Sequence, residues 1–348
     1  MKTWCFALLA LVGISGCSPA YVLRAGYEEA KILWRRQPIE QMLARDDLDE
    51  SLRDKLGLVL RAREFAEEAL GLRVGGSYAS YASVDADQIV HVVTAAQRFR
   101  LEAHTWWFPI VGSVPYKGYF AEADARAEAQ ALENDGLDVY VRTSAAFSTL
   151  GWFDDPLLST VLRRDRIDVV DTVLHELLHN TSYIGGQASF DESFANFVGH
   201  RAGIEFFAAQ GETAAVEAAR ERWADALRFS EFLTGVVAEL QDAYARGVTL
   251  DERQELFEAT QARFRTIPFR TDRYAGYAFL TLNNAIILHE QLYFDRLALF
   301  EGLFQAQGGD LRGTIRLVID AATANPDDPY AAVSQLLSPA RSPTPPGV

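Results

Sequence analysis

The stretch "DTVLHELLHNTSYIGGQASFDESF", residues 171–194, carries two histidines four residues apart, and a glutamate directly follows the first. On an α-helix His175 and His179 lie one turn apart on the same face, so both imidazoles can reach one ion. Glu176 points to the side of that pair, where it can hydrogen-bond a water held by the ion. This HExxH spacing predicts two zinc ligands and a general base.

A third ligand is expected on the next helix. The glycine pair 185–186 is expected to end the first helix, and a second helix begins near Ser189, which allows an antiparallel pair. Glu192 would then supply a carboxylate from the first turn of that helix. An alternative is that Ser189-x-x-Glu192 forms a capping box, in which Glu192 bonds only a backbone N–H. The second helix also carries small residues one turn apart, at Ala195, Gly199 and Gly203. Such a stripe lets two helices approach closely, which favours the ligand role.

The N-terminus "MKTWCFALLALVGISGC" has a short basic start and an apolar run that is too short to span a bilayer. We therefore interpret residues 1–16 as a signal peptide. The segment "ISGC" resembles the lipobox of bacterial lipoproteins, which implies a lipid on Cys17 and anchoring at the bacterial cell envelope, on the periplasmic face of a membrane. The other cysteine, Cys5, lies in the segment that would be removed. An ordinary secretory signal or a buried apolar N-terminus are the alternatives.

Composition excludes one class of partner. The chain has 348 residues, of which 49 % are hydrophobic and 23 % charged, as is typical of a globular protein. Its net charge of −15 argues against nucleic-acid binding, because no basic stretch could neutralise phosphates. The oligomeric state is left open.

Periodicity predicts a helix-rich α+β fold. Apolar residues recur at three- and four-residue spacing in most of the chain, and short runs rich in Val, Ile and aromatic residues predict strands between them. The predicted helices are 22–72 with a break at Pro38, 120–136, 166–184, 190–208, 214–245, 251–264 and 275–305; the predicted strands are 88–95, 104–112 and 137–143. We expect one domain over residues 17–338, followed by a Pro-rich disordered tail over 339–348.

The segment "HELLHNTSYIGGQASFDESFANFVG" is similar to the core of a bacterial family described as putative aminopeptidases, which are gluzincin-like HExxH zincins. The stretches 76–82, 105–141 and 146–160 also resemble that family. The resemblance implies a zincin-like fold with a small β-sheet beside the HExxH helix. It also implies one Zn²⁺ per chain on His175, His179 and Glu192, with Glu176 catalytic.

The chain departs from the family pattern at two positions in this segment. Asp191 stands where an Asn is expected, and Gly199 stands where an acid is expected. Neither residue is an expected ligand, so the departures bear on substrate fit and not on the chemistry.

Several polar residues are candidates to assist the ion. Asn196 and Asp171 each lie one helical turn from a predicted ligand and could orient it by hydrogen bonding. A plain surface Asn and a first-turn acid are the alternatives. His200 is a further candidate for catalysis, although such a histidine is more often structural. The remaining histidines, His91, His104 and His289, have no metal spacing and are interpreted as structural.

Peptide hydrolysis needs a donor for the developing oxyanion, and Tyr183, Tyr274 and Tyr277 are the candidates. The stretches 148–156 and 114–120 could pair with an extended peptide, or their aromatic residues could simply lie in the core. An aminopeptidase also needs a carboxylate for the substrate's free amine, and the candidates are Glu122, Asp154 and Asp155.

The sequence thus predicts a zinc-dependent peptide hydrolase that acts on peptides, with an aminopeptidase ahead of an endopeptidase. The rival hypothesis is a non-catalytic lipoprotein scaffold in which zinc braces two helices. A structural zinc site usually has four protein ligands, whereas three ligands leave a position for water. The three predicted ligands therefore favour catalysis.

Overall fold

The fold is described from a computed structural model, which covers residues 33–84, 90–108, 112–144 and 154–337. The predicted signal peptide, Cys17, the Pro-rich tail and most of the stretch 148–156 lie outside these residues. Within them no helix is both long and apolar enough to cross a membrane.

The described chain is a helix-rich α+β protein, as the periodicity predicts. Its helices are α2 (Ile39–Leu43), α3 (Glu50–Glu68), α4 (Glu122–Asn134), α5 (Arg166–His179), α6 (Ala188–Ala209), α7 (Thr213–Arg246), α8 (Leu250–Phe264), α9 (Asn284–Phe294), α10 (Leu297–Ala306), α11 (Leu311–Ala324) and α12 (Pro329–Leu337), with 3-10 helices η2 (Val161–Arg163) and η3 (Asp272–Phe279). Its strands are β1 (Gln37–Pro38), β2 (Ser80–Ala82), β3 (Val90–Ala96), β4 (Trp106–Phe108), β5 (Gly112–Val114), β6 (Lys117–Tyr119), β7 (Asp138–Ser144) and β8 (Leu157–Leu158).

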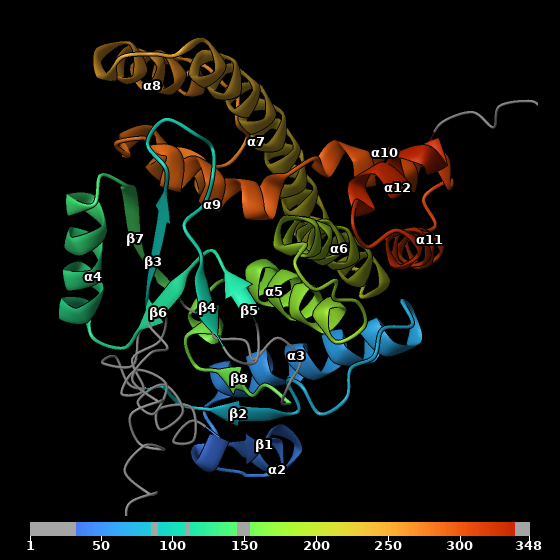
Figure 1. Cartoon of the computed structure of the whole chain (residues 1–348). Helices are drawn as coiled ribbons and strands as arrows, with labels where there is room; N and C mark the ends of the chain where they lie inside the picture. The colour runs from blue at the N-terminus through green and yellow to red at the C-terminus, as the bar shows by residue number, and fades with distance from the viewer. Residues whose placement is uncertain (1–32, 85–89, 109–111, 145–153, 338–348) are drawn as a thin grey trace, which may run out of the picture.

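The largest strands form an antiparallel sheet in the order β6-β3-β7. Val93 and Ala95 of β3 face α4, where they join an apolar cluster with Leu132. Helix α9 packs on the same two strands, β3 and β7, and lies on the side away from α4 (Figure 1). The sheet is therefore covered by a helix on each face. A short sheet β1-β2-β8 and the hairpin β4-β5 lie below and beside α5.

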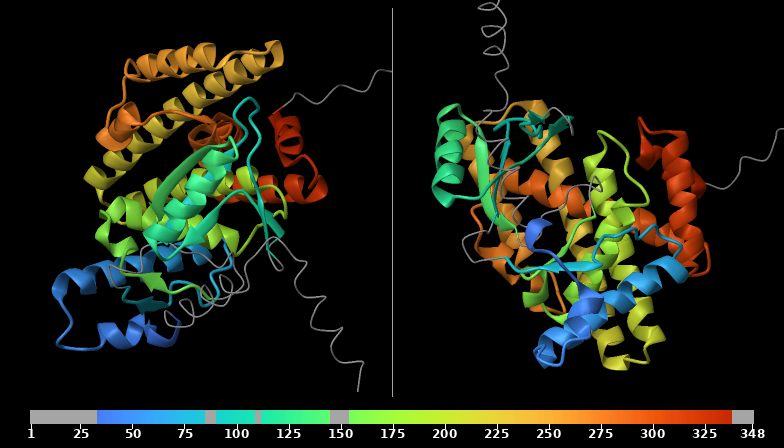
Figure 2. Two further views of the ribbon diagram at one scale, coloured as in Figure 1. Left: turned by 60° about the vertical axis from the view of Figure 1, so that its left-hand side comes forward. Right: turned by 90° about the horizontal axis from the view of Figure 1, so that it is seen from below.

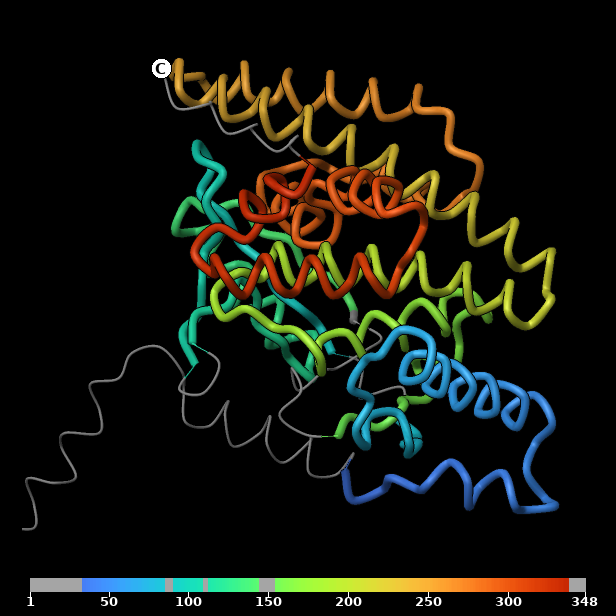
Figure 3. The backbone as a smooth tube through the Cα atoms, turned by 90° about the vertical axis from the view of Figure 1, so that its right-hand side faces the viewer, coloured from blue at the N-terminus to red at the C-terminus, as the bar shows by residue number. Residues whose placement is uncertain are grey.

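Helices α5 and α6 pack against each other at the centre of the molecule, with α3 on one side and α7 on the other (Figure 1). Helix α7 continues far beyond this core and returns through α8, so that the two form a long helical hairpin (Figures 2 and 3). The core beside α6 is rich in fully buried phenylalanines, among them Phe190, Phe194, Phe197 and Phe300. These rings fix the face of α6 that is turned away from α5.

The small-residue stripe of α6 lies against α5, as the sequence predicts. A Cβ at Gly199 would lie 2.7 Å from the carbonyl oxygen of Asp171, and one at Gly203 would lie 2.2 Å from Asp171 Oδ1. A side chain at Gly199 would push the two helices apart, because it meets a backbone oxygen that cannot move aside, whereas one at Gly203 would displace the Asp171 carboxylate. This close approach also explains why an acid cannot occupy position 199 in this chain.

Three predicted helices differ from the structure. The predicted helix 22–72 is interrupted a second time between α2 and α3, and α3 ends at Glu68. Helix α5 ends at His179 and not at residue 184, because the chain turns at Asn180 and the connection to α6 follows. The predicted helix 275–305 is divided into η3, α9 and α10. The Asn283 side chain caps α9 by accepting the Ile286 N–H, and Arg296 takes a left-handed φ of 50° between α9 and α10. Helices α11 and α12 were not predicted.

Replacing Gly199 by Ala should lower the free energy of unfolding by about 1–3 kcal/mol, because the added methyl meets a backbone atom that cannot move aside. Gly235→Ala in α7 is the matched control, because nothing lies within 4 Å of its Cβ position and Ala is the better helix former. Urea unfolding of both variants gives the comparison. Equal stability of the two would show that α5 and α6 are not held at this distance.

Candidate metal centre

Helix α5 presents both histidines to α6. The Asp165 side chain begins the helix by accepting the backbone N–H groups of Ile167 and Asp168. Seven apolar side chains of the helix are buried in the core, at Ile167, Val169, Val170, Val173, Leu174, Leu177 and Leu178. The direction of the polar face is therefore set by packing, and it turns His175 and His179 toward α6.

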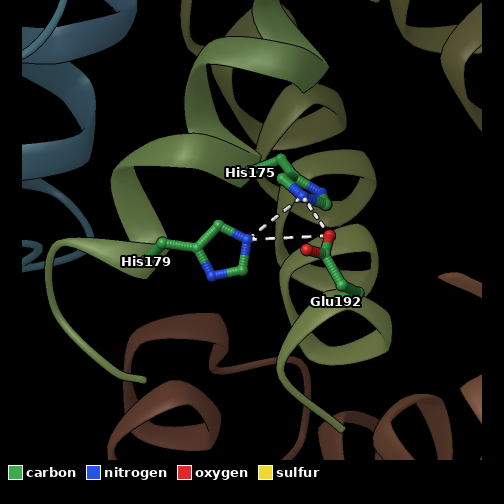
Figure 4. A group of neighbouring side chains, drawn as sticks. All are labelled: His175, His179 and Glu192. Carbon is green, nitrogen blue, oxygen red and sulfur yellow. Dashed lines mark hydrogen bonds and ion pairs between the residues drawn. The ribbon is translucent and has the colours of Figure 1, made fainter. Parts of the chain in front are cut away.

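The side chains of His175, His179 and Glu192 converge on one point (Figure 4). Glu192 Oε2 lies 3.2 Å from His175 Nε2 and 3.8 Å from His179 Nε2, and the two Nε2 atoms are 3.3 Å apart. The three side chains are 15 %, 5 % and 17 % exposed, so the cluster is shielded but can be reached from solvent.

The capping-box alternative for Glu192 is wrong. Helix α6 begins two residues earlier than that pattern requires, with Gln187 at the N-cap and no side-chain capping bond. The Ser189 hydroxyl donates instead to the carbonyl oxygen of Gln291 in α9. Glu192 is therefore free of the helix terminus and directed at the histidines.

The electrostatics of the cluster are those of a charged pair. Burial alone would raise the pKa of Glu192, but hydrogen bonds from His175 and His179 hold it well below its ordinary value. Burial alone would lower the pKa of His179, but Glu192, with further contributions from Glu176 and Asp191, raises it to about 9. A bound cation would have to displace this proton, so the affinity for a metal should fall as the pH is lowered.

The geometry of the cluster fits a tetrahedral ion. Two ligand atoms at about 2.0–2.1 Å from a tetrahedral Zn²⁺ lie roughly 3.3 Å from each other. The observed separations of 3.2, 3.3 and 3.8 Å bracket this value. Two imidazole nitrogens and a carboxylate oxygen are also a donor set that zinc accepts. The other ring nitrogen of His179, Nδ1, is buried without a hydrogen-bond partner among the described residues.

Glu176 is half-buried on α5 beside the cluster. Burial is the largest cause of the raised pKa of Tyr78, Tyr116 and Tyr293, and the charge of Glu176 also contributes to it. Glu176 is therefore within electrostatic reach of phenol groups from three different parts of the chain.

Two of the residues predicted to orient ligands have other partners. Asp171 Oδ2 lies 2.8 Å from His200 Nδ1, and neither carboxylate oxygen of Asp171 bonds the ring of His175. Asn196 Nδ2 donates to the carbonyl oxygen of Tyr293, at 2.7 Å. Asp171 and His200 thus join α5 to α6, and Asn196 joins α6 to α9.

The predicted oxyanion donors are also placed elsewhere. Tyr274 and Tyr277 are buried in a second apolar cluster around Phe229, and their hydroxyls have no partner among the described residues. Tyr183 follows the end of α5 and is 45 % exposed. Burial raises the pKa of its phenol, and the charges of Asp191 and then Glu192 raise it further. Of the three tyrosines, only Tyr183 is near the cluster.

Sequence reasoning missed Tyr293 at the site, and for Tyr116, in the stretch 114–120, it left open a place beside a bound peptide or in the core. The Tyr293 ring lies 6.4 Å from the His175 ring, centre to centre. After burial, Glu192 is the largest influence raising the pKa of both phenols. Tyr293 comes from α9, about a hundred residues after Glu192, and its one sequence signal is its place one helical turn after His289.

The three carboxylates predicted to bind an amine have different partners. Glu122 pairs with Arg126 on the exposed face of α4, and Asp154 accepts the backbone N–H of Gly76. Asp155 is buried, and its backbone carbonyl accepts the N–H of Tyr78. The stretch 114–120 supplies β6 and Tyr116 to the surroundings of the cluster.

The fold and site together define a helix-rich α+β protein in which HExxH and a downstream glutamate form a three-residue cluster. The family model described as "Putative aminopeptidase" matches residues 20–328, and the chain belongs to this family. Neither a curated protein nor a solved structure matches the chain.

The family departure at Asp191 has a physical consequence. Both oxygens of this buried carboxylate accept the Ile184 N–H at 3.1 Å, which holds the connection between α5 and α6. Burial raises the pKa of Asp191 to about 7; the Ile184 N–H and His179 oppose the shift, and Glu192 adds to it. A folded-state pKa above the unfolded value of about 3.9 means that stability is lost as the pH rises between these values.

When the pH of metal-free protein is raised from 4 to 8, the free energy of unfolding should therefore fall less in Asp191→Asn than in the wild type. The measurement is the urea midpoint of both proteins at the two pH values, with the exposed change Asp46→Asn as a control for net charge. Identical pH dependence in wild type and Asp191→Asn would contradict the burial of an ionisable carboxylate at this position.

Proposed function

We propose that the protein is a zinc-dependent peptide hydrolase that uses one Zn²⁺ per chain, held by His175, His179 and Glu192. The convergence of three ligand atoms at 3.2–3.8 Å is the observation that carries the proposal. A bound Zn²⁺ supplies Lewis acidity, which polarises a peptide carbonyl and acidifies a water molecule.

Residues of the chain provide the proton transfers and the stabilisation of the oxyanion. Glu176 accepts a proton from the attacking water and returns it to the leaving amine, because its half-buried carboxylate borders the cluster without belonging to it. Tyr116 and Tyr293, whose phenol groups lie within electrostatic reach of Glu192 and Glu176, are candidates to donate a hydrogen bond to the developing oxyanion. The family description supports an aminopeptidase.

Two other functions for the same zinc site can be distinguished from this proposal. An endopeptidase of the envelope would use the same ligands and the same base, and cleavage products would distinguish it. A scaffold in which zinc only braces α5 and α6 would ordinarily complete its coordination with a fourth protein ligand. Within the described ranges the cluster has three members, which supports catalysis.

We also propose a zincin-like fold, one domain over residues 17–338 and a lipid anchor on Cys17 at the periplasmic face of a membrane. The short apolar run and "ISGC" support the anchor. Mass spectrometry of the mature N-terminus tests it, because an unmodified terminus elsewhere in the chain would exclude lipidation at Cys17.

Glu176→Gln should keep the fold and the zinc but lose hydrolysis by about 10²–10⁴-fold or more, because an amide cannot accept the proton. The measurement is peptide cleavage at equal metal content for wild type, Glu176→Gln and the control Glu255→Gln on the exposed face of α8. The control should retain wild-type activity.

Two outcomes would oppose the proposal. Full activity of Glu176→Gln would mean that another residue is the base. A zinc-loaded wild type that cleaves none of a broad mixture of peptides would favour the scaffold.

A further inference from the structure

One cation, Arg142, lies between the antiparallel sheet and α9. Alternate residues of β7 face opposite sides of the sheet. Val139 and Val141 pack into the apolar cluster on the α4 side. Tyr140 faces α9, where its ring lies 5.7 Å from the ring of His289. Arg142 is two residues from Tyr140 and shares its face, so it is directed toward α9.

A row of rings leads from this face of the sheet to the metal cluster. The His289 ring lies 5.6 Å from that of Tyr293, and the Tyr293 ring lies 6.4 Å from that of His175. Arg142 is within electrostatic reach of His289 and Tyr293 in this row, and of Tyr116. Burial and Glu192 raise the pKa of Tyr293, and Arg142 opposes them. The same balance of burial, Glu192 and Arg142 acts on Tyr116.

Among the described residues, Arg142 lacks the carboxylate partner that Arg253 and Arg201 have. Its Nε is buried without a hydrogen-bond acceptor, and no carboxylate of the described residues forms an ion pair with it. By contrast, Arg253 pairs with Asp138 and Arg201 pairs with Glu301. A buried donor without an acceptor costs about 1–3 kcal/mol, so such groups are normally paired. An acceptor from outside the chain would remove this cost.

Glu290 on α9 is an acid within electrostatic reach of Arg142. Burial raises the pKa of Glu290 to about 7, and Arg142 opposes the shift. Near neutral pH a substantial fraction of Glu290 is therefore protonated. A protonated Glu290 cannot form an ion pair with the guanidinium of Arg142.

We infer that Arg142 binds a carboxylate of the peptide substrate on the side of the metal cluster that faces β3 and β7. The inference rests on the proposed peptidase function. Guanidinium and carboxylate match as planar, two-pronged partners, and their hydrogen bonds are charge-assisted. The carboxylate can come from the C-terminus of a short peptide or from an acidic side chain, and the two sources share the same chemistry.

The test measures binding without turnover, in zinc-loaded Glu176→Gln protein. Calorimetry compares trialanine with its C-terminal amide, and Ala-Glu-Ala amide with Ala-Gln-Ala amide. At least one carboxylate-bearing peptide should bind about 10- to 100-fold more tightly than its neutral partner, as expected for a charge-assisted hydrogen bond. The pair that shows the preference identifies the source of the carboxylate.

The same titrations are repeated in proteins that also carry Arg142→Gln, Arg142→Lys or the control Arg126→Gln. Arg142→Gln should abolish the preference, and Arg142→Lys should reduce it, because Lys keeps the charge but not the fork. Arg126 lies on the exposed face of α4, 74 % accessible, and its variant should keep the full preference. Circular dichroism checks the fold of each protein.

The inference is overturned if the Glu176→Gln protein with Arg142 unchanged shows no preference for the carboxylate-bearing peptides. It is also overturned if the full preference survives in a folded protein that carries Arg142→Gln or Arg142→Lys. Failure of all four peptides to bind overturns it as well. Cleavage of trialanine amide by the wild type separately tests the proposed function. Cleavage without a carboxylate preference refutes Arg142 alone, whereas a preference without cleavage refutes the peptidase and leaves the anion site standing.

Discussion

The close approach of α5 and α6 is the constraint on which the metal centre depends. A Cβ at Gly199 would collide with the backbone carbonyl oxygen of Asp171, so the two helices can pack at this distance only with glycine at that position; a Cβ at Gly203 would displace the Asp171 carboxylate. The same approach brings Glu192 to 3.2 Å from His175 Nε2. Phenylalanines behind α6 hold it in place, because they fill the core on its other side. Ligand geometry is thus a consequence of helix packing.

A second set of contacts joins this helix pair to the sheet. Helix α9 ends beside α6, and its last carbonyl groups have no partners within the helix. Three side chains of α6 donate hydrogen bonds to these carbonyl oxygens: Ser189 to that of Gln291, Ser193 to that of Leu292 and Asn196 to that of Tyr293. The residues of α6 that flank Glu192 therefore hold α9, and α9 brings Tyr293 to His175. Polar residues near a metal ligand can thus serve the assembly of the site without touching the ion.

The local part of this arrangement could be predicted from the sequence, and the long-range part could not. The spacing of His175 and His179 and the small-residue stripe of α6 are helical patterns, and both appear in the structure as predicted. The role of Asn196 and the places of Tyr274 and Tyr277 were misjudged, because helix periodicity gives a face and not the partner that covers it. Arg142 had a signal in the alternation of β7, but its direction toward the site depends on how the sheet packs on α9.

The central claim is that His175, His179 and Glu192 hold a catalytic zinc ion with an open position. Diffraction from zinc-loaded crystals, measured on both sides of the zinc absorption edge, tests it most directly. The account predicts one anomalous peak per chain at about 2.0–2.2 Å from these three side chains, with solvent as the remaining ligand. A peak elsewhere, or a fourth protein ligand that closes the coordination sphere, would contradict it.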